Sequence, residues 1–311
     1  MFPAPAYYVA FPGFAGGQLA IIDPATLNIR GFAKLPGVDG GSTGDLYAAP
    51  TKPVLYAIAD FGMDVAVVST NVLKVQRLIT LPHPIDSLAI SPSGDRLYGF
   101  NATGSRSPND VFVIAGDMVT ATITLPAQPG GVTVANGGRD IFASMPSSNK
   151  ILVIDRDTNL IERTIFLGSC PFFGGSNPCE PIDLTTSTDG RYVIAACWRN
   201  AVVVDSVTDA IVQKIPLERG HGRVVAVDPF SNMVWLGFNG SWVGMSMAPP
   251  FSTTAMNHAG GAYSLAFQSA GLGAVLVQFD SSRFFVDRFT PTGYVRTTKV
   301  PVFPQTIVFS P

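Results

Sequence analysis

The chain contains only three histidines, and each lies in a polar loop just ahead of a short apolar run. His83, His221 and His258 precede these runs by four to seven residues. Imidazole titrates near neutral pH, so these side chains are candidates for general acid and base catalysis. With the carboxylate of Glu180, which precedes another such run, His221 and His258 could also hold zinc, copper or iron. We predict no cofactor, with this divalent metal site as the alternative, and capping of backbone groups as the structural interpretation.

Two arginines accompany the histidines at equivalent positions. Arg199 follows one apolar run, and Arg223 lies two residues ahead of the next anchor along the chain. Together with His221 they would form a cationic wall suited to a carboxylate, an enolate or a lactone oxygen. The competing interpretation is that both arginines form salt bridges with Asp183 and Glu180 and hold the loops in place.

Further polar and aromatic side chains fall in the same class of loop. Trp198 could line an apolar ligand, although tryptophan also packs commonly between sheets. The predicted substrate contacts from these loops are Tyr263, Trp198, Asn239, Asp280, Asp60, Asn101 and Glu180.

The longest insertion is Gly168–Pro181, with the sequence GSCPFFGGSNPCEP. A disulfide between Cys170 and Cys179 would rigidify this loop and favour an oxidising compartment, such as the secretory route. A cysteine-based metal site lacks the close paired spacing of zinc knuckles. Phe172 and Phe173 then become candidates for a lid that closes apolar surface over a ligand. Cys197 lies inside an apolar strand and is predicted to be a buried, inert thiol.

Short strands are the elements that must position these residues. Asp86–Pro126 contains four short β-branched and aromatic runs, each bounded by Gly, Pro, Asn or Asp, which is typical of strands joined by tight turns. The unit recurs every 40 to 52 residues, the period of a four-stranded propeller blade. The apolar anchors of the first strands are Leu46, Leu88, Val132, Leu184, Val225, Leu265 and Ile307.

The seventh unit is divided between the two ends of the chain. The strand at Ile307 lacks partners after it, whereas Ala6–Phe11, Gln18–Asp23 and Ile29–Leu35 lack a first strand before them. We therefore predict an all-β, seven-bladed β-propeller, in which the C-terminal strand pairs with the N-terminal strands and closes the ring. Residues 1–311 are expected to form this single domain.

Composition agrees with a propeller and excludes several partners. Hydrophobic residues make up 47% of the chain and charged residues 14%, as expected for strands buried between blades. The net charge of −2 gives no electrostatic reason to expect nucleic acid or an anionic membrane. No apolar run approaches the roughly 20 residues that span a bilayer. We predict a monomer that binds a small apolar ligand.

Three hairpins carry a resemblance to a known family. LAIIDPATLNIRGFAKLPG, ILVIDRDTNLIERTIFLG and VVVDSVTDAIVQKIPL each have an apolar strand ending in Asp, a nearby Thr, and an alternating strand. SPSGDRLYGF and STDGRYVIAA supply a Ser-x-x-Gly turn before a Tyr-containing strand. The chain resembles the YVTN-repeat family of seven-bladed propellers, to which lactonase-like propellers are similar. The resemblance is weak around Trp235–Met247, which looks irregular. It implies the fold but supplies no catalytic residue.

The loops that enter each first strand and those between second and third strands open at one end of the central channel of a propeller. This funnel is therefore the expected ligand site. We predict a small-molecule enzyme of specialised metabolism, a lyase, isomerase or cyclase, that acts on an apolar natural-product-like substrate by His/Arg acid–base chemistry or oxyanion stabilisation. The alternatives are a lactonase-type hydrolase and a non-catalytic binding or scaffold propeller.

Overall fold

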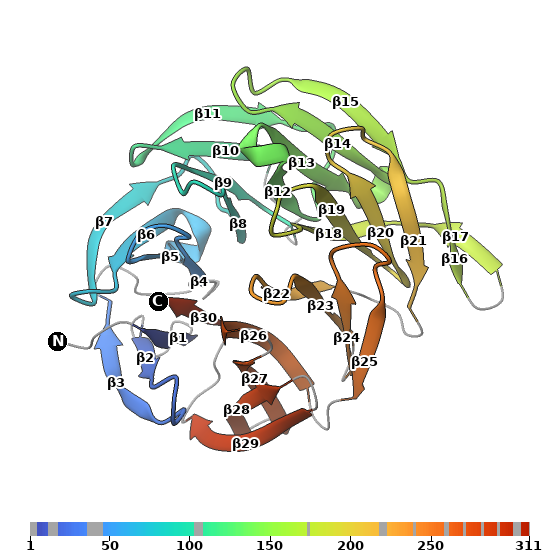
Figure 1. The fold of residues 1–311 in the computed structure, drawn as a ribbon. Helices are drawn as coiled ribbons and strands as arrows, with labels where there is room; N and C mark the ends of the chain where they lie inside the picture. The colour runs from blue at the N-terminus through green and yellow to red at the C-terminus, as the bar shows by residue number, and fades with distance from the viewer. Residues whose placement is uncertain are drawn as a thin grey trace. The chain divides into compact units, whose positions relative to one another are not determined.

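The computed structural model describes residues 5–11, 18–35, 46–102, 108–172, 175–217, 223–238, 241–257, 261–269, 272–280, 283–290, 293–300 and 306–310. These residues contain seven four-stranded antiparallel sheets and one separate two-stranded hairpin (Figure 1). Each predicted anchor lies in the first strand of its sheet. The prediction of an all-β, seven-bladed β-propeller is confirmed.

The chain forms two compact units, and three sheets belong to the first, Met1–Asp86 with Asn257–Pro311. One sheet contains β4 (Leu46–Ala48), β5 (Val54–Ala59), β6 (Asp64–Ser69) and β7 (Lys74–Thr80), with the short 3-10 turn η2 (Asp60–Gly62). Another contains β26 (Gly261–Ser269), β27 (Leu272–Asp280), β28 (Arg283–Thr290) and β29 (Gly293–Val300). The third contains β30 (Thr306–Ser310), β1 (Ala6–Phe11), β2 (Gln18–Ile22) and β3 (Ile29–Lys34).

The third sheet of this unit joins the two ends of the chain, as predicted. β30 pairs antiparallel with β1, with Val9 opposite Ile307 and Tyr8 opposite Val308. In Figure 1 the red C-terminal strand accordingly lies beside the dark blue first strand. All six residues of β1 are buried. Pairing on both edges therefore leaves β1 no exposed backbone edge within its sheet.

Four sheets belong to the second unit, Ser87–Met256. The first two contain β8 (Ser87–Ile90), β9 (Arg96–Phe100), β10 (Asp110–Ala115) and β11 (Met118–Thr124), then β12 (Val132–Ala135), β13 (Asp140–Met145), β14 (Lys150–Asp155) and β15 (Ile161–Phe166). The others contain β18 (Pro181–Thr186), β19 (Tyr192–Cys197), β20 (Asn200–Asp205) and β21 (Ile211–Pro216), then β22 (Arg223–Asp228), β23 (Met233–Phe238), β24 (Ser241–Ser246) and β25 (Thr253–Asn257). Two 3-10 turns, η3 (Asn136–Gly138) and η4 (Pro146–Ser148), flank β13.

Burial along the strands follows their order in each sheet. The middle strands β19 and β20 are buried at every residue, and their side chains pack into apolar clusters shared with the neighbouring sheets. The outermost strand β11 instead alternates between exposed residues and residues that are partly or, at Ile123, fully buried. This is the pattern of a strand with one face toward a core and one toward water. The segment Trp235–Met247, which looks irregular in sequence, contributes to the regular strands β23 and β24.

Candidate functional site

The insertion between β15 and β18 forms a disulfide-closed hairpin. β16 (Ser169–Phe172) pairs with β17 (Gly175–Pro178), and Cys170 and Cys179 are joined with an S–S distance of 2.09 Å. Both cysteines are buried and belong to the apolar cluster between the sheets of β12–β15 and β18–β21. The predicted disulfide is confirmed, and it fixes the base of the hairpin within a packed core.

The hairpin lies against the outer part of its sheet. β16 contacts β21 and β20, and in Figure 1 the hairpin extends outside β21. Lys214 of β21 holds it there, because its Nζ donates hydrogen bonds to the carbonyls of Leu167 and Ser169, the latter at 2.7 Å. The lid over the funnel that the sequence predicts for Phe172 and Phe173 stays a prediction, because Phe173 and the side chain of Phe172 are not among the described parts of the chain. The anchoring lysine lies 45 residues further along the chain than Ser169, so local sequence does not indicate this position.

A pocket of about 620 Å³ lies between the hairpin and the turn that joins β19 to β20. Arg199 and Glu180, both exposed, supply opposite charges to it, and Trp198, 40% exposed, supplies an aromatic face. The lining residues are Cys170, Asn177, Pro178, Cys179, Glu180, Trp198, Arg199 and Asn200. The pocket thus combines a guanidinium, a carboxylate, two amides and a disulfide.

Two details of the pocket wall depart from ordinary protein structure. Glu180 has a φ of +48°, a backbone conformation that costs free energy for a residue with a Cβ and that is found disproportionately at functional sites. Asn200 is only 3% exposed, and its Oδ1 has no hydrogen-bond partner within the described part of the chain. Buried acceptors are normally satisfied, so this oxygen is an exception within the pocket wall.

Cys197 precedes the same turn, as the last residue of β19. It is a free cysteine with no exposed surface. Burial raises the pKa of its thiol to about 12; the nearby Lys214 ammonium opposes this rise and the Glu180 carboxylate adds to it. Since the thiolate is the reactive form, Cys197 is suited to packing rather than to nucleophilic catalysis.

The structure brings together five of the residues singled out from sequence: Cys170, Cys179, Glu180, Trp198 and Arg199 all line the pocket. The reason is topological, since the loop entering β18 and the turn after β19 must open at the same end of one antiparallel sheet. Sequence analysis missed Asn177 and Pro178. Their position in or beside the flagged insertion and turn is the signal that could have found them.

Three other predicted residues lie in described loops outside this pocket. His83 is exposed in the loop before β8, and Asp60 is exposed at the start of η2 with a φ of +45°. Asn101 follows β9, and its carbonyl and side-chain oxygens both accept from Gln128 Nε2 at 3.3 Å. These contacts assign Asn101 a role in fixing its loop.

The remaining predicted residues are not placed at side-chain level. Four of them lie outside the described residues: His221, Asn239, His258 and Phe173. Four others lie in β22, β26, β27 and β16 with side chains that are not described: Arg223, Tyr263, Asp280 and Phe172. The cationic wall of His221, Arg199 and Arg223 and the histidine acid–base site therefore stay predictions. Within the described residues, no group of three or more His, Cys, Asp or Glu side chains is arranged to hold a metal ion.

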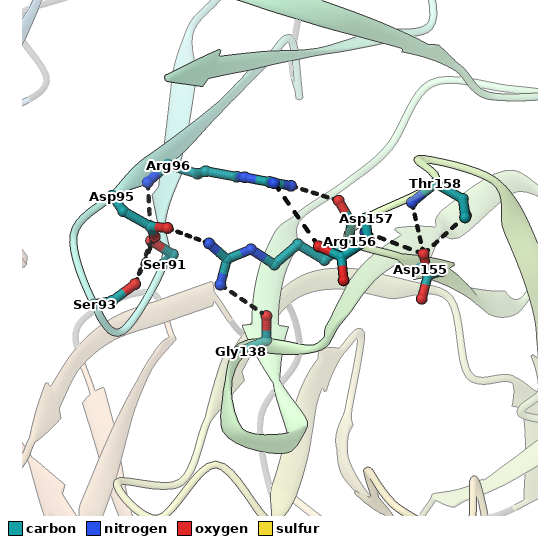
Figure 2. Close-up of polar contacts among 9 residues, drawn as sticks. All are labelled: Ser91, Ser93, Asp95, Arg96, Gly138, Asp155, Arg156, Asp157 and Thr158. Carbon is teal, nitrogen blue, oxygen red and sulfur yellow. Dashed lines mark hydrogen bonds and ion pairs between the residues drawn. The ribbon is translucent and has the colours of Figure 1, made fainter. Parts of the chain in front are cut away.

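The opposite end of the same sheets, where first strands turn into second and third into fourth, is called the turn end here. Figure 2 shows one of its networks, in which Asp95 accepts from Ser91, Ser93 and Arg156. Burial disfavours the charged form of Asp95, but the two serine hydrogen bonds and the Arg156 guanidinium outweigh it and lower its pKa to about 2. The network joins the sheet of β8–β11 to that of β12–β15.

The aspartates of the three repeated hairpins also belong to turns. Asp23, Asp155 and Asp205 each accept, through Oδ1, from the backbone amides two and three residues on, at 2.7 to 3.0 Å. Such Asx turns replace the hydrogen bonds that a tight reversal leaves unmade. The repeated Asp residues thus have a structural role in these turns.

The comparisons with known proteins agree on the fold. No family model and no curated protein matches the chain. A functionally unknown protein from Desulfotomaculum acetoxidans is similar over 98% of this chain and 99% of its own, with a TM-score of 0.77 and 12% identity. A putative 6-phosphogluconolactonase from Bacteroides uniformis matches over the same shares, with a TM-score of 0.71 and 13% identity. Kuenenia stuttgartiensis hydrazine synthase matches over 86% and 89%, with a TM-score of 0.66 and 15% identity.

These similarities define the class of protein, a seven-bladed β-propeller, and at such low identities they show the fold alone. Within the described residues, no helix is long and apolar enough to cross a bilayer.

Proposed function

We propose that this propeller binds a small organic anion in the pocket beside the disulfide hairpin. The observation that carries the proposal is the convergence of Arg199, Glu180 and Trp198 on one cavity of about 620 Å³. That volume is within the range of small-molecule sites, roughly 300–1,000 Å³. Arg199 would pair with a carboxylate or enolate oxygen of the ligand, while Trp198 would stack on a planar apolar part.

The chemistry that suits this pocket is proton transfer next to a stabilised oxyanion. Glu180 would remove a proton from a carbon beside a carbonyl group, and Arg199 would stabilise the negative charge that develops on the carbonyl oxygen. If Glu180 returns the proton to a different carbon of the substrate, the reaction is an isomerisation. If the substrate instead expels a leaving group from the neighbouring carbon, the reaction is that of a lyase. His221, His258 and Arg223 remain the further acid–base and oxyanion-stabilising candidates that the sequence predicts.

A lactonase is the second candidate. Glu180 would activate water for attack on the lactone carbonyl, and Arg199 would stabilise the tetrahedral oxyanion before the ring opens to a hydroxy acid. The likeness to a structure described as a putative 6-phosphogluconolactonase makes this candidate worth testing. Acid release from a panel of lactones, recorded at constant pH, distinguishes it from the isomerase and lyase reactions.

The wider proposal is a monomeric YVTN-type propeller that needs no cofactor and does not bind nucleic acid. The confirmed disulfide supports an oxidising compartment for it. A non-catalytic binding propeller would share the pocket but turn over no substrate.

The test uses the three tryptophans of the chain. Trp235 and Trp242 are buried at 3% and 1% exposure, so Trp198 is the accessible one. In protein labelled with 5-fluorotryptophan, the fluorine resonance of Trp198, assigned with Trp198→Phe, should shift on titration with 2-naphthoate. The uncharged 2-naphthalenemethanol should bind at least tenfold more weakly, since it lacks the carboxylate that pairs with Arg199.

Two arginine variants provide the matched comparison. Arg199→Met should weaken 2-naphthoate binding at least tenfold. Arg191→Met, which changes an exposed arginine at the turn end of the same sheet, should leave it unchanged. Absence of a saturable shift, or equal affinity in wild type and Arg199→Met, would overturn the proposed function.

A further inference from the structure

Asn149 lies next to the hairpin pocket but does not line it. It follows η4 and precedes β14, with a φ of 53° and a ψ of 44°. This left-handed conformation is one that Asn tolerates better than most residues. Its own amide donates to the Pro146 carbonyl at 3.3 Å, so the turn holds Asn149 in a defined position.

The side chain of Asn149 joins the two ends of the segment that contains the hairpin. Its Nδ2 donates to the carbonyl of Gly168 at 2.6 Å, before the hairpin. Its Oδ1 accepts from the amide of Glu180 at 3.1 Å, after the hairpin. An amide side chain carries a donor and an acceptor on one planar group. It can therefore bind the carbonyl of one chain segment and the N–H group of the other.

A third contact attaches the hairpin to the same residue through the main chain. The carbonyl of Asn149 accepts from the amide of Leu167 at 3.1 Å. The disulfide closes the loop covalently just inside the positions that the side chain bridges, since Cys170 and Cys179 lie between Gly168 and Glu180. The loop is therefore held twice, by its own disulfide and by a turn of the preceding sheet.

This contact bears on the strained residue of the pocket. Glu180 adopts a positive φ that its own side chain disfavours, so something outside the residue must stabilise it. The hydrogen bond from the Glu180 amide to Asn149 Oδ1 is a directional contact at that backbone. This hydrogen bond fixes the position of the Glu180 backbone, from which the carboxylate side chain extends. Glu180 lies two residues after Pro178, which also lines the pocket.

We propose that Asn149 is a positioning residue, which holds Glu180 in its left-handed conformation and thereby sets the shape of the hairpin pocket. The inference rests on the proposed function in that it assigns Asn149 a part in the same pocket. It acts through Glu180 and does not touch the ligand.

The left-handed backbone provides a sharp test. Asn149→Gly keeps the backbone conformation accessible while it removes both side-chain hydrogen bonds. Amide exchange should then become at least fivefold faster at Glu180, whose acceptor is lost. Exchange at Leu167 should be unchanged, because its acceptor is the retained carbonyl of residue 149. Asn149→Asp keeps an acceptor for Glu180 and should preserve the protection of that amide.

The matched control is Asn159→Gly, another asparagine with a positive φ, at 57°, in the turn after β14. The affinity for 2-naphthoate should fall at least fivefold in Asn149→Gly and stay at the wild-type value in Asn159→Gly. Equal rates of Glu180 amide exchange in wild type and Asn149→Gly would overturn the inference. If wild type binds 2-naphthoate, an equal affinity of Asn149→Gly for it would also overturn the inference. If wild type binds no 2-naphthoate, the proposed function fails, and Glu180 exchange alone still decides whether Asn149 positions Glu180.

Discussion

The two ends of the sheets in the second unit use the same residue types differently. At the turn end, arginines are matched to carboxylates by contacts between and within sheets, such as Arg156 to Asp95 and Arg163 to Asp140. At the pocket end, Arg199 and Glu180 lie on the wall of one cavity. A charged residue therefore indicates a site through its surroundings rather than through its type.

The backbone shows the same contrast. Positive φ values at the turn end fall mostly on Gly, Asn and Asp residues such as Gly190, Asn136 and Asp209, which adopt them at low cost, with Phe251 as an exception. At the pocket end a positive φ falls on Glu180, a residue with no such preference. We therefore expect substitutions at the turn end to change stability alone and those at the pocket end to change binding as well.

The largest effect should come from breaking the pocket end. Replacing both Cys170 and Cys179 by Ser removes the covalent closure of the hairpin, and loop entropy predicts a loss of about 2–3 kcal/mol in the free energy of unfolding. The 2-naphthoate affinity should also fall at least tenfold, because both cysteines line the pocket. Urea unfolding and fluorine titration measure the two changes. Unaltered affinity would show that the pocket does not depend on the hairpin.

Arg163→Met tests the turn end. Arg163 donates to Asp140 at 2.9 Å and to Asp209, and Asp140 is only 5% exposed. Its removal leaves the buried Asp140 carboxylate without the Arg163 charge, which should lower the free energy of unfolding by about 2 kcal/mol. The loss is smaller than for a fully buried pair because Arg163 is itself half-exposed. The affinity for 2-naphthoate should be unchanged. A parallel loss of affinity would contradict the division between the two ends.

Asp95→Asn should have a smaller effect of about 1 kcal/mol at pH 7. The pKa of Asp95 is lower in the folded protein, about 2, than in the unfolded chain, about 3.9. Its charged form therefore adds stability above pH 4, and that contribution disappears as the pH falls toward 2. The difference between wild type and Asp95→Asn should shrink over this window in urea unfolding. A difference that stays constant from pH 7 to pH 2.5 would exclude this assignment.

The smallest expected change is at Cys197, the buried residue just before the turn that lines the pocket. Because burial raises the pKa of its thiol to about 12, native protein at pH 8 should show no reaction with iodoacetamide over an hour. Protein unfolded in guanidinium chloride should take up one equivalent per chain. Rapid labelling of the native protein would mean that the core below the pocket opens readily.

The sequence predicts the strands well because their information is local. Apolar runs bounded by Gly, Pro and Asp place every anchor from Leu46 to Ile307 on a first strand, and Asp-to-Thr spacing identifies the turns at Asp155 and Asp205. Around Trp235–Met247, where the resemblance to the repeat family is weak, β23 and β24 still pair as regular strands.

The candidate site is predictable only in part, for the same reason. Strand order dictates that Glu180, Trp198 and Arg199 share one end of a sheet, so their convergence follows from topology. The role of Asn149 does not, since its contact to Glu180 spans 31 residues and no spacing rule links a turn asparagine to a distant loop. The hairpin's position beside β21 depends in turn on Lys214, which reads in sequence as an ordinary exposed strand residue.

The pairing of β30 with β1 has a consequence for protein synthesis. β1 is synthesised almost 300 residues before β30, the strand that pairs with its inner edge. At about 5–20 residues per second, β1 waits on the order of 15–60 s with one edge uncovered. AYYVAF carries no charge and no proline, so it can pair with other nascent chains during this interval. Yield of soluble protein should therefore depend on how quickly translation finishes, and slower elongation should favour aggregation.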